Sequence, residues 1–162
     1  MNRFAHAVYC DDIRFEVGNK QSLVGVYHGK MFVPTFPVTM PKLCVALWVV
    51  TPAENPFQAL TLKLLFGNKV VVEAPLPAEL FQAQETIVEP PDPLNTRIFT
   101  AYTTLQLSPL KVDAPVTLKL RIQTEKEELK AGGLEIELAA QSTEPVSTRG
   151  SSSVVEPSTS RG

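Results

Sequence analysis

Short runs of alternating apolar and polar residues, separated by turn and loop signals, occupy most of the chain. The clearest alternation lies in 115–124, where four apolar residues share one face: Val116, Leu118, Leu120 and Ile122. Because successive side chains of a strand point to opposite faces, this pattern predicts a half-buried strand. The alternation of Leu134, Ile136 and Leu138 predicts its cross-strand partner.

Two further segments give strong strand signals. Residues 58–66 and 69–74 predict a hairpin, since Gly67-Asn68 between them is a two-residue turn that matches the twist of the flanking strands. Residues 42–51 are the most hydrophobic segment and contain the single tryptophan, Trp48. This segment therefore predicts the centre of a sheet.

The rest of the pattern fills in the predicted element order. Strands are expected at 4–13, 20–28, with 30–33 as a continuation, and 97–107. The three prolines of 34–41 predict an extended loop, and 109–115 is expected to form another loop.

Helix is scarce in this pattern. Residues 77–85 form the single predicted helix, two turns at most, and the charged segment 125–133 predicts a solvated turn. Seven to nine short strands with at most one short helix predict an all-β fold, an antiparallel β-sandwich that is immunoglobulin-like or C2-like. A closed barrel is the less favoured alternative.

Composition divides the chain in two. Residues 1–141 carry nearly all large apolar side chains and predict the sandwich domain, whereas 142–162 has no aromatic residue, Leu or Ile and predicts a disordered tail rich in Ser and Pro. The tail contains a near-repeat, 144–150 and 156–162. It is either a duplicated low-complexity segment or a linear motif used twice for avidity.

Charge and hydropathy argue against several classes of function. The 162 residues include 15 Lys+Arg and 17 Asp+Glu, a net charge of -2, which argues against a nucleic-acid binder. The longest apolar run, 43–50, is too short to cross a membrane. The first residues lack the apolar core of a signal peptide, so the expected location is cytoplasmic.

Motifs for catalysis and metal binding are missing from the sequence. It contains no phosphate-binding glycine loop, serine elbow or Cys-x-x-Cys pair, so the chain is predicted not to be an enzyme and to need no cofactor. A zinc set of His6, Cys10, Asp12 and His28 fails because the turn at 18–19 places His28 near His6 and leaves Asp12 far away. Calcium at Asp11, Asp12 and Glu16 lacks a second acidic loop.

The two cysteines, Cys10 and Cys44, are too few for a disulfide scaffold. They are expected to be small buried residues of strands, with a functional disulfide or metal pair as the alternative.

The segment Tyr9-Cys10-Asp11-Asp12-Ile13-Arg14, followed by 16–20 (EVGNK) and 22–27 (SLVGVY), resembles a family of small uncharacterised bacterial proteins, a domain of unknown function. The pairs 33–34 and 37–38 and the segment 41–44 continue the resemblance, which covers roughly residues 9–50. It implies no activity, and it implies that such genes lie in bacterial or prophage genomes.

Four charged residues of this segment are the candidate binding site: Asp11, Asp12, Arg14 and Glu16. They either tie a strand to its turn or form a binding epitope. With no catalytic set and a polar tail, the sequence predicts a non-enzymatic module that binds another protein or a copy of itself through its edge strands. The alternatives are a C2-like module that binds calcium, a small ligand or a lipid surface, and a small enzyme that uses Asp11, Asp12 or His6.

Overall fold

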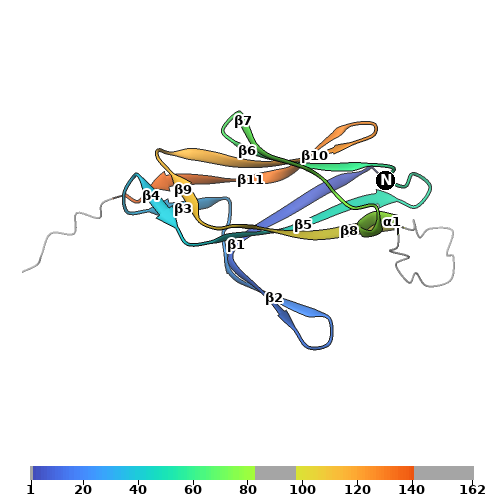
Figure 1. Cartoon of the computed structure of the whole chain (residues 1–162), viewed down its shortest axis with the longest axis horizontal. Coiled ribbons are helices and arrows are strands. Elements are labelled where there is room, and N and C mark those ends of the chain that lie inside the picture. Colours follow the sequence, from blue (N-terminus) through green and yellow to red (C-terminus); the bar gives the residue numbers. More distant parts are fainter. Residues whose placement is uncertain (1, 83–97, 141–162) are drawn as a thin grey trace, which may run out of the picture.

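The computed structural model describes residues 2–82 and 98–140. Two sheets hold most of these residues (Figure 1). Sheet A has four antiparallel strands in the order β2-β1-β5-β8: β2 (Lys20–Val26), β1 (Phe4–Glu16), β5 (Leu43–Pro52) and β8 (Ile98–Leu107).

Sheet B is mixed, because its edge strand β3 runs parallel to β11. Its order is β3-β11-β10-β6-β7, with these bounds: β3 (Lys30–Val33), β11 (Glu128–Leu138), β10 (Val116–Thr124), β6 (Leu60–Phe66) and β7 (Lys69–Pro75). A small third sheet pairs β4 (Val38–Met40) with β9 (Leu110–Val112), and the single described helix is α1 (Glu79–Gln82).

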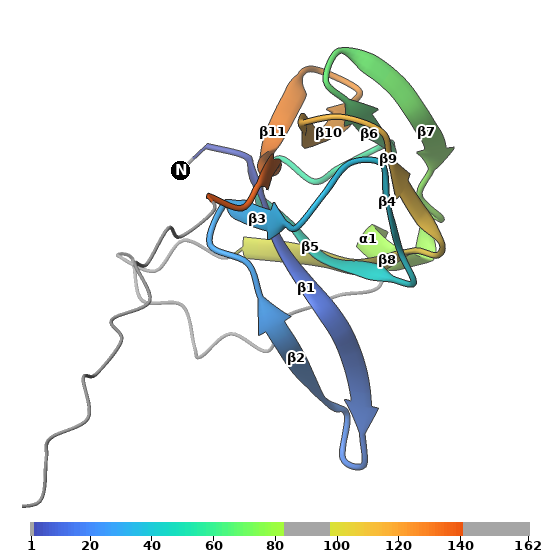
Figure 2. The same ribbon diagram turned by 90° about the vertical axis from the view of Figure 1, so that its left-hand side faces the viewer.

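The core lies between the facing sides of sheets A and B, which form two layers (Figure 2). Alternate residues of the central strands β5 and β10 supply several of its largest fully buried side chains, among them Leu43, Leu47, Leu118, Leu120 and Ile122. This arrangement confirms the all-β sandwich predicted from the alternation.

Several predicted elements are confirmed in detail. Strand β5 lies between β1 and β8, at the centre of sheet A as its hydrophobicity indicated. The predicted hairpin is β6-β7, whose strands pair up to Phe66 and Lys69 across a turn where Gly67 has a φ of +60°. Strand β10 pairs with β11 through Leu118 and Leu134, as predicted.

Residues 30–33, expected to continue the strand of 20–28, instead form β3 in the other sheet, parallel to β11. Three more segments differ from the prediction. Residues 128–133, expected in a solvated turn, begin β11, and 38–40 and 110–112, expected in loops, form the short strands β4 and β9. The described residues thus contain eleven strands rather than seven to nine. A β-bulge explains the difference at 128–133: the register shifts opposite Leu120 and Arg121, and Gly132 there has a φ of +105°.

Helix α1 lies within the predicted helical segment 77–85, of which 83–85 is outside the described residues. The tail 142–162 is also outside them, so its predicted disorder and the domain boundary at 141 stay predictions.

Candidate functional site: a projecting arm of strands β1 and β2

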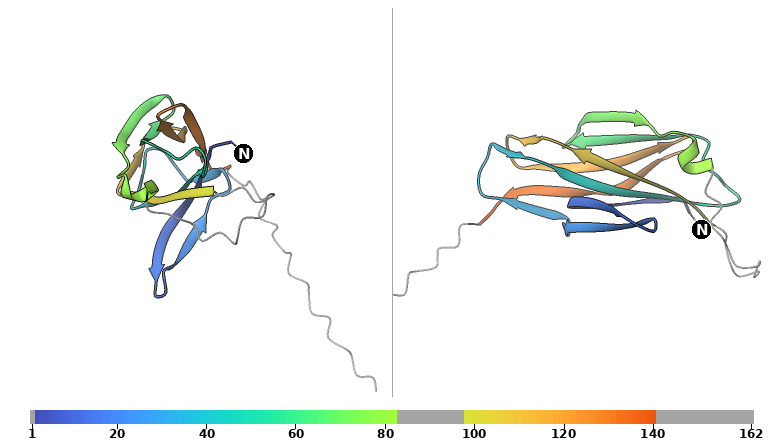
Figure 3. Two further views of the ribbon diagram at one scale, coloured as in Figure 1. Left: turned by 90° about the vertical axis from the view of Figure 1, so that its right-hand side faces the viewer. Right: turned by 60° about the horizontal axis from the view of Figure 1, so that its bottom comes forward.

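Strand β1 is longer than the sheet that contains it. Its first part, Phe4–Cys10, pairs with β5, whereas its second part is paired, among the described strands, with β2 alone. Residues 11–26, here called the arm, therefore leave the sandwich as a two-stranded ribbon. Figures 2 and 3 show the arm projecting away from both layers.

A glycine permits the bend at the base of the arm. Gly25 has a φ of +67°, and a Cβ atom built there would lie 2.0 Å from Oδ2 of Asp11. Other residues rarely adopt this left-handed conformation, so both the backbone and the available space call for glycine. The glycine in the predicted second strand thus marks a close approach of side chain to backbone.

The two aspartates of the candidate site hold the base of the arm. Asp11 accepts a hydrogen bond from the Tyr27 hydroxyl, and Asp12 accepts one from Nζ of Lys42, the residue just before β5. The hydrogen bond from Lys42 is the main reason why the pKa of Asp12 is lowered, and the same bond raises the pKa of Lys42. Both carboxylates are therefore engaged by neighbouring side chains.

Arg14 and Glu16 lie further out along the arm. Arg14 donates from Nε to Asp12 over 3.4 Å, and its side chain is 68% exposed. Glu16 accepts a hydrogen bond from the Ser22 hydroxyl across the ribbon. The four predicted site residues thus follow one strand rather than converge. Within 2–82 and 98–140, no three His, Cys, Asp or Glu side chains are placed to hold a metal ion.

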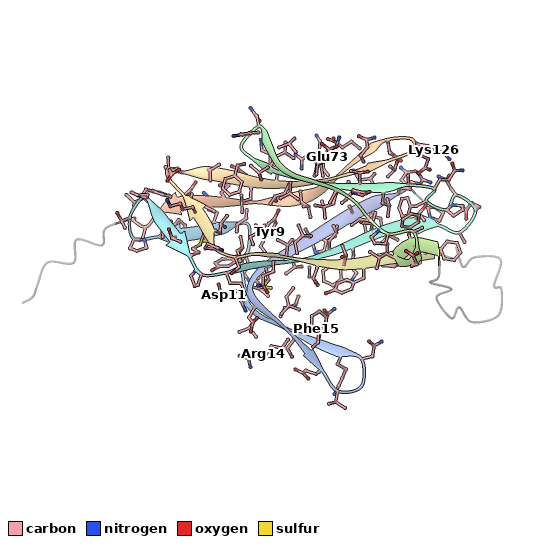
Figure 4. All side chains as sticks on the ribbon, viewed as in Figure 1. Tyr9, Asp11, Arg14, Phe15, Glu73 and Lys126 are labelled. Carbon is pink, nitrogen blue, oxygen red and sulfur yellow. The ribbon has the colours of Figure 1, made fainter. Side chains whose placement is uncertain are left out.

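The apolar residues of the arm were missed by the sequence interpretation. Ile13 pairs with Leu23 and Phe15 with Gln21, so Ile13, Phe15 and Leu23 share one face of the ribbon. Phe15 is 73% exposed and Val17, in the turn, is 95% exposed. Figure 4 shows Phe15 and Arg14 on the arm, well away from the interior position of Tyr9. A signal was available: two apolar residues, Phe15 and Val17, lie within three residues of the Gly18-Asn19 turn, where polar residues are usual.

One further contact ties the arm to sheet A. The hydroxyl of Tyr102, on β8, donates a hydrogen bond to the Gln21 side chain of β2. Burial of Tyr102 raises its pKa, so the hydroxyl stays protonated and able to donate at neutral pH.

Both cysteines lie at the base of the arm. Cys10 and Cys44 are direct partners in the β1-β5 register, and both are free and buried. Burial is the largest cause that raises the pKa of the Cys10 thiol. The prediction of small buried strand residues is confirmed, and the thiolate needed for reaction is disfavoured.

We expect both thiols to be protected in the folded chain. Cys10 is 0% and Cys44 4% exposed, so a water-soluble thiol reagent should label them at least roughly tenfold more slowly than in denaturant, where both become accessible. Absorbance of the released chromophore follows the reaction. Equal rates with and without denaturant would contradict the burial of this pair.

A separate pocket of about 450 Å³ brings the two histidines together. His6 and His28 line it, with Tyr9, whose buried hydroxyl has no hydrogen-bond partner among the described residues. Burial raises the pKa of Tyr9 to about 12. Asp11 and Asp12 do not line this pocket, so the structure does not gather there the three residues of the enzyme alternative.

The fold and the arm together define a β-sandwich with a projecting hairpin. The chain belongs to DUF6941, a family of unknown function whose model matches residues 5–148. This match confirms the resemblance seen over residues 9–50 and extends it across most of the chain. No curated protein and no solved structure matches this sequence.

No helix in the described part of the chain is both long enough and apolar enough to span a bilayer. The cytoplasmic location and the bacterial or prophage origin stay predictions.

Proposed function

We propose that this chain is a non-enzymatic protein-binding module that presents the arm to an apolar surface of a partner protein. The observation that carries the proposal is the exposure of Phe15 and Val17 at the far end of the arm. Two large apolar side chains at the tip of a projecting hairpin add nothing to the core of the sandwich. Bound by a partner, each would contribute on the order of 1.5–3 kcal/mol.

The stability of the arm supports this proposal. A two-stranded ribbon is marginally stable on its own. Three polar contacts hold this one against the sandwich: Asp11 with Tyr27, Asp12 with Lys42, and Tyr102 with Gln21. An arm held in place before binding loses less conformational entropy when a partner is bound.

The second face of the arm supplies polar groups around the apolar tip. This face carries the even-numbered residues of β1, which alternate along the strand with the apolar residues of the first face. They are Asp12, Arg14 and Glu16, and they lie opposite Val24, Ser22 and Lys20 of β2. An apolar centre with a charged rim is typical of protein interfaces, where the rim sets orientation and selectivity. The predicted epitope of Asp11, Asp12, Arg14 and Glu16 thus becomes the base and rim of a binding surface.

Photo-crosslinking tests the proposal with a matched pair of positions. A photoreactive phenylalanine analogue replaces Phe15 in one variant and Phe32 in the other, since Phe32 is also well exposed, at 61%, but lies on β3. In cells that make this protein, we expect a discrete adduct of a second protein at position 15 and none at position 32. Mass spectrometry of the adduct identifies the partner.

A second variant checks that the apolar tip is what binds. Phe15→Ser combined with Val17→Ser should leave the melting temperature unchanged, since both residues are exposed. The double variant should lower the affinity for the partner protein at least roughly tenfold. Adducts of equal yield at both positions, or full affinity in the double variant, would contradict the proposal.

A further inference from the structure

Within the described residues, sheets A and B have four edge strands, and three of them carry features that discourage pairing with another chain. Strand β2 has Lys20 and the bend at Gly25, and β3 is four residues long and begins with Lys30. Strand β7 contains Lys69, Glu73 and Pro75, and its register shifts opposite Leu64 and Leu65. Charges, prolines, bulges and short length are the usual protection of an exposed edge.

Strand β8 has none of these features. Its ten residues, Ile-Phe-Thr-Ala-Tyr-Thr-Thr-Leu-Gln-Leu, include no charged residue, proline or glycine. Its register with β5 runs without a shift from Leu43 and Leu107 to Pro52 and Ile98. Within the described residues, no strand pairs with its other side, and helix α1, whose Phe81 is buried in the core, lies on the inner side of β8 (Figure 2).

The register shows which backbone groups of β8 face outward. Tyr9 accepts a hydrogen bond from the Tyr27 amide on the side away from β5, so the adjacent Cys10 points its backbone groups at β5. Because these directions alternate along and across antiparallel strands, the outward groups of β8 belong to its even-numbered residues. These are Ile98, Thr100, Tyr102, Thr104 and Gln106.

We propose that β8 pairs antiparallel with β8 of a second copy of this chain, so that the two A sheets join into one eight-stranded sheet. A two-fold axis through Tyr102 lets all five outward residues take part, with Thr100 opposite Thr104 and Ile98 opposite Gln106. Directly opposite residues then lie on the same face, as an antiparallel pair requires. The backbone edge that pairs belongs to β8 and not to the arm, which touches β8 through the Tyr102 side chain. This inference therefore does not depend on the proposed function.

The composition of β8 favours a second copy over a different partner. When a strand pairs with itself around a two-fold axis, a charged residue near the axis lies close to the same charged residue of the second copy. The repulsion between these like charges destabilises the pair. The absence of charge from all ten residues removes this repulsion. Opposed threonines on one face are also a favourable cross-strand pair.

Light scattering with one proline variant and its matched control tests the pairing. The full chain is expected to show twice the 17.8 kDa mass of one chain at high concentration. Thr104→Pro removes an amide hydrogen that faces outward, a position where an edge strand tolerates proline, and should give the single-chain mass. Thr104→Val keeps the amide and the β-branched side chain and should stay dimeric.

Hydrogen exchange on the unmodified chain provides a second readout. The amides of Thr100, Tyr102 and Thr104 should exchange more slowly at high than at low protein concentration. Should Thr104→Pro fail to fold, Thr104→Lys takes its place, because it adds a charge close to the axis. A single-chain mass of the unmodified protein at every concentration would overturn the proposal. So would a dimer that Thr104→Pro, or Thr104→Lys in its place, leaves intact. The double variant at Phe15 and Val17 should remain dimeric, which separates this surface from the arm.

Discussion

Replacing Glu125 with alanine is expected to lower the free energy of unfolding by roughly 3 kcal/mol. Glu125 lies 2.7 Å from the guanidinium of Arg3, whose side chain is 1% exposed. Removing one partner of a buried ion pair costs about 3–5 kcal/mol because the other charge stays buried without compensation. The lower end applies here, since the Glu125 side chain is 17% exposed and the pair lies near the surface.

The remaining contacts of Arg3 explain why this charge is buried at all. Arg3 donates to Oγ1 of Thr51 and to the carbonyl oxygens of Asn55 and Pro56, and its guanidinium lies 4.7 Å from the ring centre of Phe57. Together with the ion pair to Glu125, these contacts join the residue just before β1 to the end of β5, to the segment after β5 and to the β10-β11 turn. Arg3 therefore closes one end of the sandwich, and Glu125 neutralises it there.

Urea denaturation measures this effect, with Glu127→Ala as the control. Glu127 lies two residues away in the same turn and its side chain is exposed, so its replacement should change the free energy of unfolding by no more than about 0.5 kcal/mol. Equal losses of unfolding free energy in the two variants would show that the effect comes from changing the turn and not from breaking the ion pair.

The same ion pair makes the stability depend on pH. Burial acts to raise the pKa of Glu125, but hydrogen bonds from Arg3 and from backbone amides outweigh it, so the folded pKa is lowered. A carboxyl whose pKa is lower in the folded than in the unfolded chain stabilises above the unfolded pKa, about 4.3 for Glu. The stability gap between the unmodified chain and Glu125→Gln should thus be full at neutral pH and shrink as pH falls through the folded pKa.

Local pattern predicts the sandwich because each strand signal is contained in its own few residues. The alternation of Val116 to Ile122 fixes which side of β10 faces the core, whatever the neighbouring strands are. The continuous apolar run of β5 indicates a strand covered on both sides, and Gly67-Asn68 fixes a turn. None of these inferences needs to know the strand order.

The arm could not be predicted in this way, because it depends on where another strand stops pairing. Ile13 and Phe15 have the same parity as the buried Tyr9, so the pattern alone places them in the core. They lie outside it because β5 begins at Leu43 and pairs no further than Cys10. The candidate residues Asp11 and Asp12 were chosen for a local reason, since paired carboxylates interrupt an apolar strand. Their partners Tyr27 and Lys42 are set by tertiary contacts.

Replacing Leu120 with alanine is expected to cost about 2–5 kcal/mol, the usual range for a buried leucine whose removal leaves a cavity. Leu120 is 0% exposed, lies on the central strand of sheet B and is paired with Leu64 on β6. For a domain of this length, the melting temperature should fall by roughly 10 °C. Differential scanning calorimetry measures both quantities.

Val71→Ala is the control for this prediction, since Val71 is 44% exposed on the edge strand β7 and its replacement should cost about 0.5 kcal/mol or less. The comparison tests the step from pattern to fold directly. Leu120 and Val71 both belong to β-rich apolar segments, but Leu120 faces the core from the central strand whereas Val71 is exposed on an edge strand. If both substitutions cost the same, the alternation of β10 does not mark the buried face. If they differ as expected, the period-two pattern of this chain carries the information that places its core.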